Sequence, residues 1–307
     1  MTDNGPRPRG PNGQEERDMA NLPGDSIQIA REYMDSLLVE SRIIGALRPT
    51  CRFEFLGESF DTPIMTAALS HIDLVSMAEG AVKAGAAVSI GMGDNDALGE
   101  VLKTGAKVMK IIKPYENHDE IYSRIRYAEE NGAIAVGMDV EHSIHSGDPE
   151  PDNIHGLQMK LPSMDELREI IGSTKLPFFI KGALSVQDAK RCADLGCRGI
   201  ILSHHNGLMR YAVPPVRLLP KIRETVGDKL VLIADGGMES GFDAFKALAL
   251  GADAVTVGRP LMDALKENGA DGVRDKIKEM TDQLLVMMYR TSSADIRHID
   301  PAVIWEK

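Results

Sequence analysis

Short apolar runs alternate along the chain with longer segments of mixed polarity. Near-continuous apolar strands separated by helical segments predict a parallel sheet whose two faces are both buried. Eight such runs favour a closed barrel, so we expect an α/β fold of the (β/α)8 TIM-barrel class. The runs are PIMTA at 63–67, AAVSI at 86–90, KVMKII at 107–112, AIAVGM at 133–138, LPFFIK at 176–181, GIILS at 199–203, LVLIAD at 230–235 and AVTVG at 254–258.

Two elements are expected before the first run. Apolar residues recur at three- and four-residue steps from Ser26 to about Leu47, which predicts a helical lead-in capped by Asp25 or Ser26. The sequence CRFEFLGESF at 51–60 predicts a hairpin that plugs one end of the barrel. Residues 1–25 are rich in Pro, Gly and charge and predict a disordered tail, which leaves 26–307 as a single barrel domain.

The composition fits a small-molecule enzyme better than a nucleic-acid or membrane protein. The formal net charge is -11, whereas nucleic acids and anionic membranes attract clustered Lys and Arg. No apolar run approaches the roughly 20 residues needed to span a bilayer. The three cysteines lack metal-ligand spacing. We therefore expect a cytoplasmic protein with a small-molecule substrate and with neither nucleic acid nor membrane as a partner.

Glycines follow the seventh and eighth runs, where barrels frequently bind phosphate. Asp235-Gly236-Gly237 ends the seventh run, and Gly258-Arg259 ends the eighth. Glycine lets backbone N–H groups approach a phosphate, and Arg259 can add a charge-assisted contact. Alternatively, these glycines only form tight turns. That alternative would explain either motif alone, but it explains the two motifs together less well.

Three other runs end in groups that can transfer protons or stabilise charge. Lys181 ends the fifth run, where it either faces the barrel mouth or extends along the rim. His205 follows the sixth run, and Asp139 follows the fourth as a carboxylate that could orient it. His204 is equally open to a functional or a structural role.

A long segment at 139–163 follows the fourth run and is expected at the carboxyl end of the barrel. It fits a lid or a substrate loop. His142 and His145 with nearby acidic residues permit a metal site, but the pattern is equally typical of a solvated acidic loop. We expect no metal.

Four segments of the chain match motifs of one known family, in the same order and with almost the same spacing. They are PIMTAALS, PFFIKGALSVQDA, GIILSHHNG and ADGGMESGFDAFKALALGADAVTVGRP. Together they resemble the FMN-dependent α-hydroxy-acid oxidase and dehydrogenase family, which includes glycolate oxidase and lactate oxidase. The resemblance implies FMN as cofactor, a homo-oligomer such as a tetramer, and His205 as the base that removes a proton while Asp139 is paired with it. The cofactor residues it implies are Ala67, Ala68, Leu69, Lys181, Ser203, Asp235, Gly236, Gly237, Gly258 and Arg259.

The chain also departs from the family pattern. Leu208 stands where the family has the arginine that binds the substrate carboxylate, and Glu239 stands where it has an arginine near the phosphate. Lys110 and Ile112 replace a glutamine and a tyrosine, so we expect Lys110 near the flavin. The remaining polar candidates for substrate contact are His145, His204 and Arg210.

These features predict an FMN-dependent oxidoreductase that acts on a CH–OH group, or on the oxo form in reverse. The loss of the carboxylate-binding arginine predicts an atypical substrate. Two alternatives remain open: a flavin-dependent isomerase related to type 2 isopentenyl diphosphate isomerase, and a non-catalytic barrel that binds flavin or phosphate.

Overall fold

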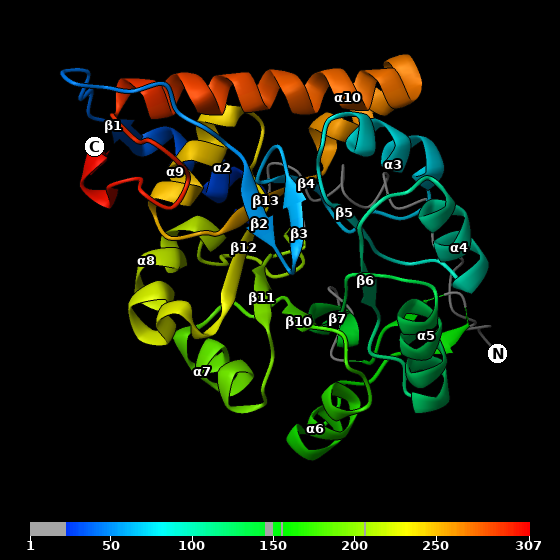
Figure 1. Cartoon of the computed structure of the whole chain (residues 1–307). Coiled ribbons are helices and arrows are strands. Elements are labelled where there is room, and N and C mark those ends of the chain that lie inside the picture. The colour runs from blue at the N-terminus through cyan, green and yellow to red at the C-terminus, as the bar shows by residue number, and fades with distance from the viewer. Residues whose placement is uncertain (1–22, 145–149, 155, 206) are drawn as a thin grey trace.

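Eight parallel strands form the centre of the fold (Figure 1), as the alternating runs predicted. The computed structural model describes residues 23–144, 150–154, 156–205 and 207–307. The sheet order is β4-β13-β12-β11-β10-β7-β6-β5. The strands are β4 (Ile64–Thr66), β5 (Val88–Ile90), β6 (Val108–Ile112), β7 (Ala135–Asp139), β10 (Phe178–Lys181), β11 (Gly199–Leu202), β12 (Val231–Asp235) and β13 (Ala254–Val257).

The two end strands, β4 and β5, are joined partly through a side chain. The Thr66 hydroxyl donates to the Ser89 carbonyl at 2.9 Å and accepts from the Ser89 N–H at 2.9 Å. One further bridge joins Leu69 to Ile90. These contacts close the barrel, so the carboxyl ends of all eight strands meet around one mouth.

Helices surround the strands on the outside (Figure 1). The long helix α10 bends at Asn268 and Gly269 and packs against α3 and α9. The helices are α2 (Ser26–Ser36), α3 (Leu74–Lys83), α4 (Asn95–Lys103), α5 (His118–Glu130), α6 (Met164–Gly172), α7 (Val186–Asp194), α8 (Pro215–Val226), α9 (Gly241–Ala249) and α10 (Arg259–Arg290), with short 3-10 turns η1 (Val140–Ser143), η2 (Gly227–Lys229) and η3 (Pro301–Val303).

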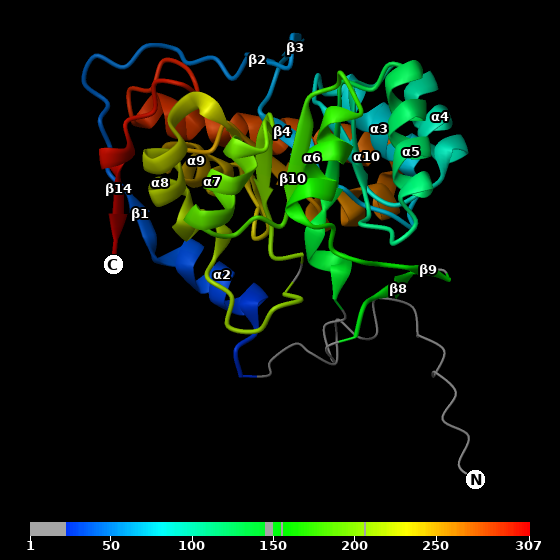
Figure 2. The same ribbon diagram turned by 90° about the horizontal axis from the view of Figure 1, so that it is seen from below.

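The predicted hairpin is present and plugs the amino end of the barrel. Strands β2 (Phe53–Phe55) and β3 (Glu58–Phe60) pair through a turn at Leu56 and Gly57, both with positive φ. Phe55 lies 6.3 Å from the inward-facing Phe179 ring, centroid to centroid. A second hairpin, β8 (Asn153–Ile154) with β9 (Leu157–Gln158), lies at the opposite end (Figure 2).

The lead-in helix is shorter than predicted. Asp25 caps it as expected, accepting from the Ile27 N–H at 2.9 Å, but the helix ends at Ser36 and not near Leu47. Residues Leu37–Val39 instead form β1, which pairs antiparallel with β14 (Ile304–Glu306). Pairing with the distant C-terminal segment overrides the local helical pattern. Residues 1–22, which hold most of the predicted tail, lie outside the described part of the chain.

Candidate active site

Asp139, Lys181 and His205 come together at the carboxyl ends of three adjacent strands. Asp139 and Lys181 are register partners at the ends of β7 and β10, and His205 follows β11. Asp139 Oδ2 lies 3.0 Å from His205 Nδ1 and 3.3 Å from Lys181 Nζ. The Lys113 ammonium, which no sequence motif indicated, contacts the same oxygen at 3.0 Å.

The lysines determine which groups in this cluster carry charge. Burial alone would raise the pKa of Asp139, but the Lys181 and Lys113 ammonium groups hold it well below its usual range. Burial, with the Lys181 charge, lowers the pKa of His205 to about 3. His205 is therefore neutral at neutral pH, the form that a base requires, while Asp139 is ionised.

The backbone around His205 is held in an unusual conformation. His205 has a φ of +43°, a left-handed value uncommon for residues other than glycine. Its N–H donates to the Ser203 hydroxyl at 3.1 Å. Strain of this kind persists where surrounding contacts fix it, and it is frequent at active sites.

His204 points to a different environment from His205. It is buried, its Nδ1 accepts from the Gly207 N–H at 3.2 Å, and its Nε2 has no partner. A Cβ atom placed on Gly236 would lie 3.4 Å from the His204 ring, so this side chain borders the glycine turn that follows β12.

The expected phosphate residues also gather at the mouth. Gly236 and Gly237 follow β12 with φ of +93° and +75°, and Gly258 caps the start of α10. The Arg259 guanidinium is half-exposed and lies 4.0 Å from the Glu239 carboxylate. Consecutive backbone N–H groups in such a turn, beside a helix N-terminus and an arginine, fit a phosphate.

The segment Ala67–Leu69 lies between β13 and β5. The Ala67 N–H donates to the Val257 carbonyl at 3.0 Å, and the Leu69 carbonyl accepts from the Gly91 N–H at 3.0 Å. Lys110 is buried, and its ammonium donates to the carbonyls of Gly91 and Gly93 at 2.6 and 3.2 Å. Burial, and then the Arg124 charge, lowers the pKa of Lys110 to about 8.

The segment after β7 adds three groups that the sequence pattern did not place at the site: Glu141, His142 and Asp152. His142 Nε2 lies 2.6 Å from His205 Nε2, and His142 Nδ1 lies 3.2 Å from Asp152 Oδ2. Burial raises the pKa of Glu141 to about 8. His142 and Asp152 share a loop rich in histidine and acid, but the contact of His142 with His205 joins residues 63 apart in the chain and has no local signal.

Several buried polar atoms at the barrel mouth lack a hydrogen-bond partner among the described residues, which fits the binding of a polar ligand such as FMN. Most buried polar groups in proteins have a hydrogen-bond partner. Within the described residues five buried side-chain polar atoms lack one, and four of these belong to residues at or just beyond the carboxyl ends of barrel strands: Ser89 Oγ, Asp139 Oδ1, Glu141 Oε2 and His204 Nε2. With the glycine turn, they form a surface suited to a flavin ring and its phosphate.

One expected substrate residue, Arg210, is not brought to this cluster. Arg210 is exposed, donates to the Pro23 carbonyl and lies 5.9 Å from the centroid of the Tyr211 ring. His145 lies outside the described residues. Leu208 is half-buried, and its N–H donates to the His204 carbonyl at 3.3 Å.

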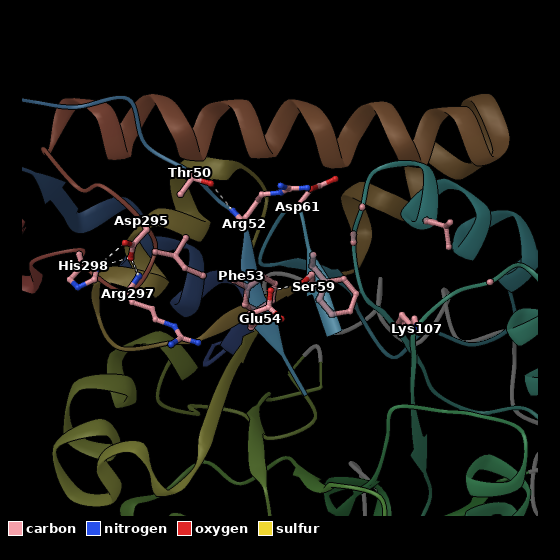
Figure 3. A pocket seen from close by; sticks show the side chains of 16 residues that line it. Thr50, Arg52, Phe53, Glu54, Ser59, Asp61, Lys107, Asp295, Arg297 and His298 are labelled. Carbon is pink, nitrogen blue, oxygen red and sulfur yellow. Dashed lines mark hydrogen bonds and ion pairs between the residues drawn. The ribbon is translucent and has the colours of Figure 1, made fainter. Parts of the chain in front are cut away.

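A cavity of about 690 Å³ lies at the other end of the barrel, beside the β2–β3 hairpin (Figure 3). Its charged side chains largely pair with one another: Arg52 with Asp61 at 3.0 Å, and His298 with Asp295 at 2.8 Å. We assign it no part in the chemistry.

Comparison with known proteins agrees with the fold and identifies the family. The family model for FMN-dependent dehydrogenase matches residues 146–306, just over half of the chain. The chain therefore belongs to the FMN-dependent dehydrogenase family, whose cofactor is FMN.

In the described residues we find no helix with the length and apolar character that crossing a membrane requires.

Individual relatives are oxidases of hydroxy acids. An L-lactate oxidase from Alicycliphilus denitrificans is 42% identical over 47% of this chain and 40% of its own length. An L-lactate oxidase from Lactobacillus jensenii is 26% identical over 82% of this chain and 71% of its own length. The first match thus spans about two fifths of the relative.

The solved structures confirm the barrel. Mandelate oxidase carrying a monooxide FMN adduct superposes with a TM-score of 0.82 at 25% identity, covering 96% of this chain and 98% of that one. An arginine-to-leucine variant of mandelate oxidase with 2-hydroxy-phenylacetamide has a TM-score of 0.83 at 24% identity, covering 92% of this chain and 90% of that one.

Proposed function

We propose that this protein is an FMN-dependent oxidoreductase that oxidises a hydroxy compound without an α-carboxylate, with His205 as the base. The observation that carries the proposal is the contact between His205 Nδ1 and Asp139 Oδ2 at 3.0 Å beside buried Lys181. The Asp139 carboxylate and the Lys181 ammonium, which is 2.9 Å away, both face Nδ1. The other ring nitrogen, Nε2, lies 2.6 Å from His142 Nε2 and is the atom proposed to accept a proton.

Bound FMN would accept the hydride equivalent from the substrate carbon. Ala67–Leu69, Gly236, Gly237, Gly258 and Arg259 are the residues proposed to hold it. Lys181 is buried beside Asp139, and the carboxyl groups of Asp139 and Asp235 raise the pKa of its ammonium against the effect of burial. A fixed ammonium at this position would stabilise negative charge that develops on the flavin.

The proposed substrate follows from Leu208, which stands where the resemblance implies a carboxylate-binding arginine. Arginine recognises carboxylates through paired N–H donors, and a leucine offers none. Among the described residues at the mouth, Lys113 is engaged by Asp139 and Lys110 by two carbonyls. 2-Hydroxy-phenylacetamide, which accompanies one mandelate oxidase variant, is a hydroxy compound without a carboxylate. We therefore expect a neutral hydroxy compound.

A matched pair of compounds tests this proposal. Protein saturated with FMN is mixed anaerobically with 2-hydroxy-phenylacetamide or with (S)-mandelic acid, and flavin absorbance is followed. We expect the amide to reduce the flavin faster, and Leu208→Arg to reverse the order by about 10-fold or more, since charge-assisted hydrogen bonds contribute about 1.5–3 kcal/mol. A wild-type preference for the acid would contradict the substrate assignment. Product formation with no external electron acceptor and no net flavin reduction would favour the isomerase alternative.

A further inference from the structure

Glu141 has a buried carboxyl oxygen without a hydrogen-bond partner. The residue as a whole is half-buried, but its Oε2 atom is buried and meets no donor in the described part of the chain. Such atoms are uncommon in folded proteins, because a polar group that leaves water without a new partner destabilises the fold. The missing partner therefore indicates a ligand.

The surroundings of Glu141 place its side chain at the barrel mouth. Glu141 belongs to η1, directly after β7, and its Cγ atom packs against Gly182, directly after β10. A Cβ atom on Gly182, whose φ is +98°, would lie 2.7 Å from that Cγ. The charge of Asp235 at the end of β12 also acts on Glu141, although β11 lies between β10 and β12. The carboxyl group therefore lies among the strand ends that surround the mouth.

The same surroundings favour the neutral form of this carboxyl group. The Lys181 and Lys113 ammonium groups contact Asp139, and no ion pair of Glu141 is found among the described residues. Burial is the largest effect and raises the pKa of Glu141 to about 8. The Asp139 and Asp235 carboxylates act in the same direction. The Lys181 and Lys113 charges oppose it.

A neutral carboxyl group is complementary to one kind of ligand group. Its O–H donates to a carbonyl and its C=O accepts from an N–H, so it can form two hydrogen bonds with an amide whose C=O and N–H lie on the same side. A carboxylate ligand offers no N–H. Primary amides present this pair of groups, and so does the pyrimidine edge of a flavin.

We propose that Glu141 is a ligand-binding residue whose neutral carboxyl group pairs with an amide-type C=O and N–H at the barrel mouth. This inference rests on the proposed function, in which the mouth holds FMN and a neutral hydroxy compound. The amide-type group belongs either to a hydroxy-amide substrate or to bound FMN, and separate binding measurements distinguish the two sources.

Two variants at this position separate binding from a structural role. Glu141→Gln keeps the shape, a donor and an acceptor but cannot ionise, whereas Glu141→Met removes both polar atoms. At pH 7 we expect Glu141→Gln to bind the ligand within about 3-fold of the wild type and Glu141→Met to bind it about 10-fold more weakly. In urea denaturation without FMN, Glu141→Met should be at least as stable as the wild type, because an unpartnered buried group is removed. A loss of stability would indicate a structural role and contradict the proposal.

Two ligands identify the group that Glu141 contacts. Quenching of flavin fluorescence measures FMN binding to the full chain. The shift of the flavin spectrum measures binding of 2-phenylacetamide, which has no hydroxyl group to oxidise, to protein saturated with FMN. Weaker FMN binding in Glu141→Met assigns the flavin as the source, and weaker amide binding assigns the substrate. In the affected measurement, wild-type binding should weaken as the pH rises above about 8, because the ionised carboxylate no longer donates.

The pH effect is assigned by its loss in Glu141→Gln, because the pKa of Lys110 is also about 8. Glu54→Gln, at the amino end of the barrel, is the control and should leave both measurements unchanged. Wild-type binding of both ligands by Glu141→Met would overturn the proposal, and so would a pH effect that persists in Glu141→Gln. Neither measurement requires turnover, so the oxidation of a hydroxy amide is decided separately by flavin reduction in the wild type.

Discussion

Asp139 has three basic neighbours on one carboxylate oxygen: Lys113, Lys181 and His205. The sequence pattern predicted two of them, because Lys181 and His205 end successive strands. Lys113 was missed because it lies beyond the apolar part of its strand, and its partner is 26 residues away. Its effect is to weaken the hold of Asp139 on a charged His205.

Lys113→Met tests this effect while keeping an apolar stem of similar length. The Lys113 charge is among the causes that lower the pKa of His205, so its removal should raise that pKa. A raised pKa means that the ring gains its proton at a higher pH. We expect the ¹⁵N titration midpoint of His205 to rise by about 1 pH unit. Lys107→Met is the matched control, because Lys107 lies beside Glu58 at the opposite end of the barrel and its loss should leave the His205 midpoint unchanged. An unchanged midpoint in Lys113→Met would contradict the proposed effect of Lys113.

Glu239 places a negative charge next to the proposed phosphate position. Its carboxylate lies 4.0 Å from Arg259 and 3.9 Å from Arg31, next to the proposed phosphate position. Glu239→Gln should therefore tighten FMN binding, by about 2- to 5-fold because exposed charge pairs contribute about 0.2–1 kcal/mol. Quenching of flavin fluorescence on titration measures it. Glu58→Gln at the far end should have no effect, and weaker binding in Glu239→Gln would show that this carboxylate helps to hold the cofactor.

At the level of elements, the strands were predictable and the lead-in was not. Each barrel strand is buried on both faces, so its apolar run is visible without knowledge of its partners. By contrast, Leu37–Val39 becomes a strand only because Ile304–Glu306 lies beside it. A pairing between the two ends of the described chain leaves no periodic signal near residue 37.

The contact between α9 and α10 depends on the absence of a side chain at Gly241. A Cβ atom there would lie 1.8 Å from the Met280 carbonyl oxygen and 2.7 Å from Gln283 Cβ. Gly241→Ala should therefore force the helices apart and lower the free energy of unfolding by at least about 1–3 kcal/mol. Urea denaturation measures this. Gly172→Ala is the control, because a Cβ there would meet nothing within 4 Å, and it should change the free energy of unfolding by less than about 0.5 kcal/mol. Equal effects in the two variants would contradict the packing argument.

On the scale of the whole molecule, the two ends of the barrel differ in the side chains that line them. Aromatic side chains of the β2–β3 hairpin seal the amino end, whereas the unpartnered polar atoms gather at the carboxyl end. The sequence predicted Asp139, Lys181 and His205 at the mouth, but Lys113 and the contact between His142 and His205 required the folded chain.

The most direct test of the account compares wild-type protein with His205→Gln. Both are saturated with FMN and mixed anaerobically with 2-hydroxy-phenylacetamide, and the rate of flavin bleaching is measured by stopped-flow absorbance. General base catalysis contributes about 10²- to 10⁴-fold, so we predict a loss of that size in His205→Gln with FMN binding retained. Bleaching at the wild-type rate in His205→Gln, or none in the wild type with this amide and with hydroxy acids, would contradict the central claim.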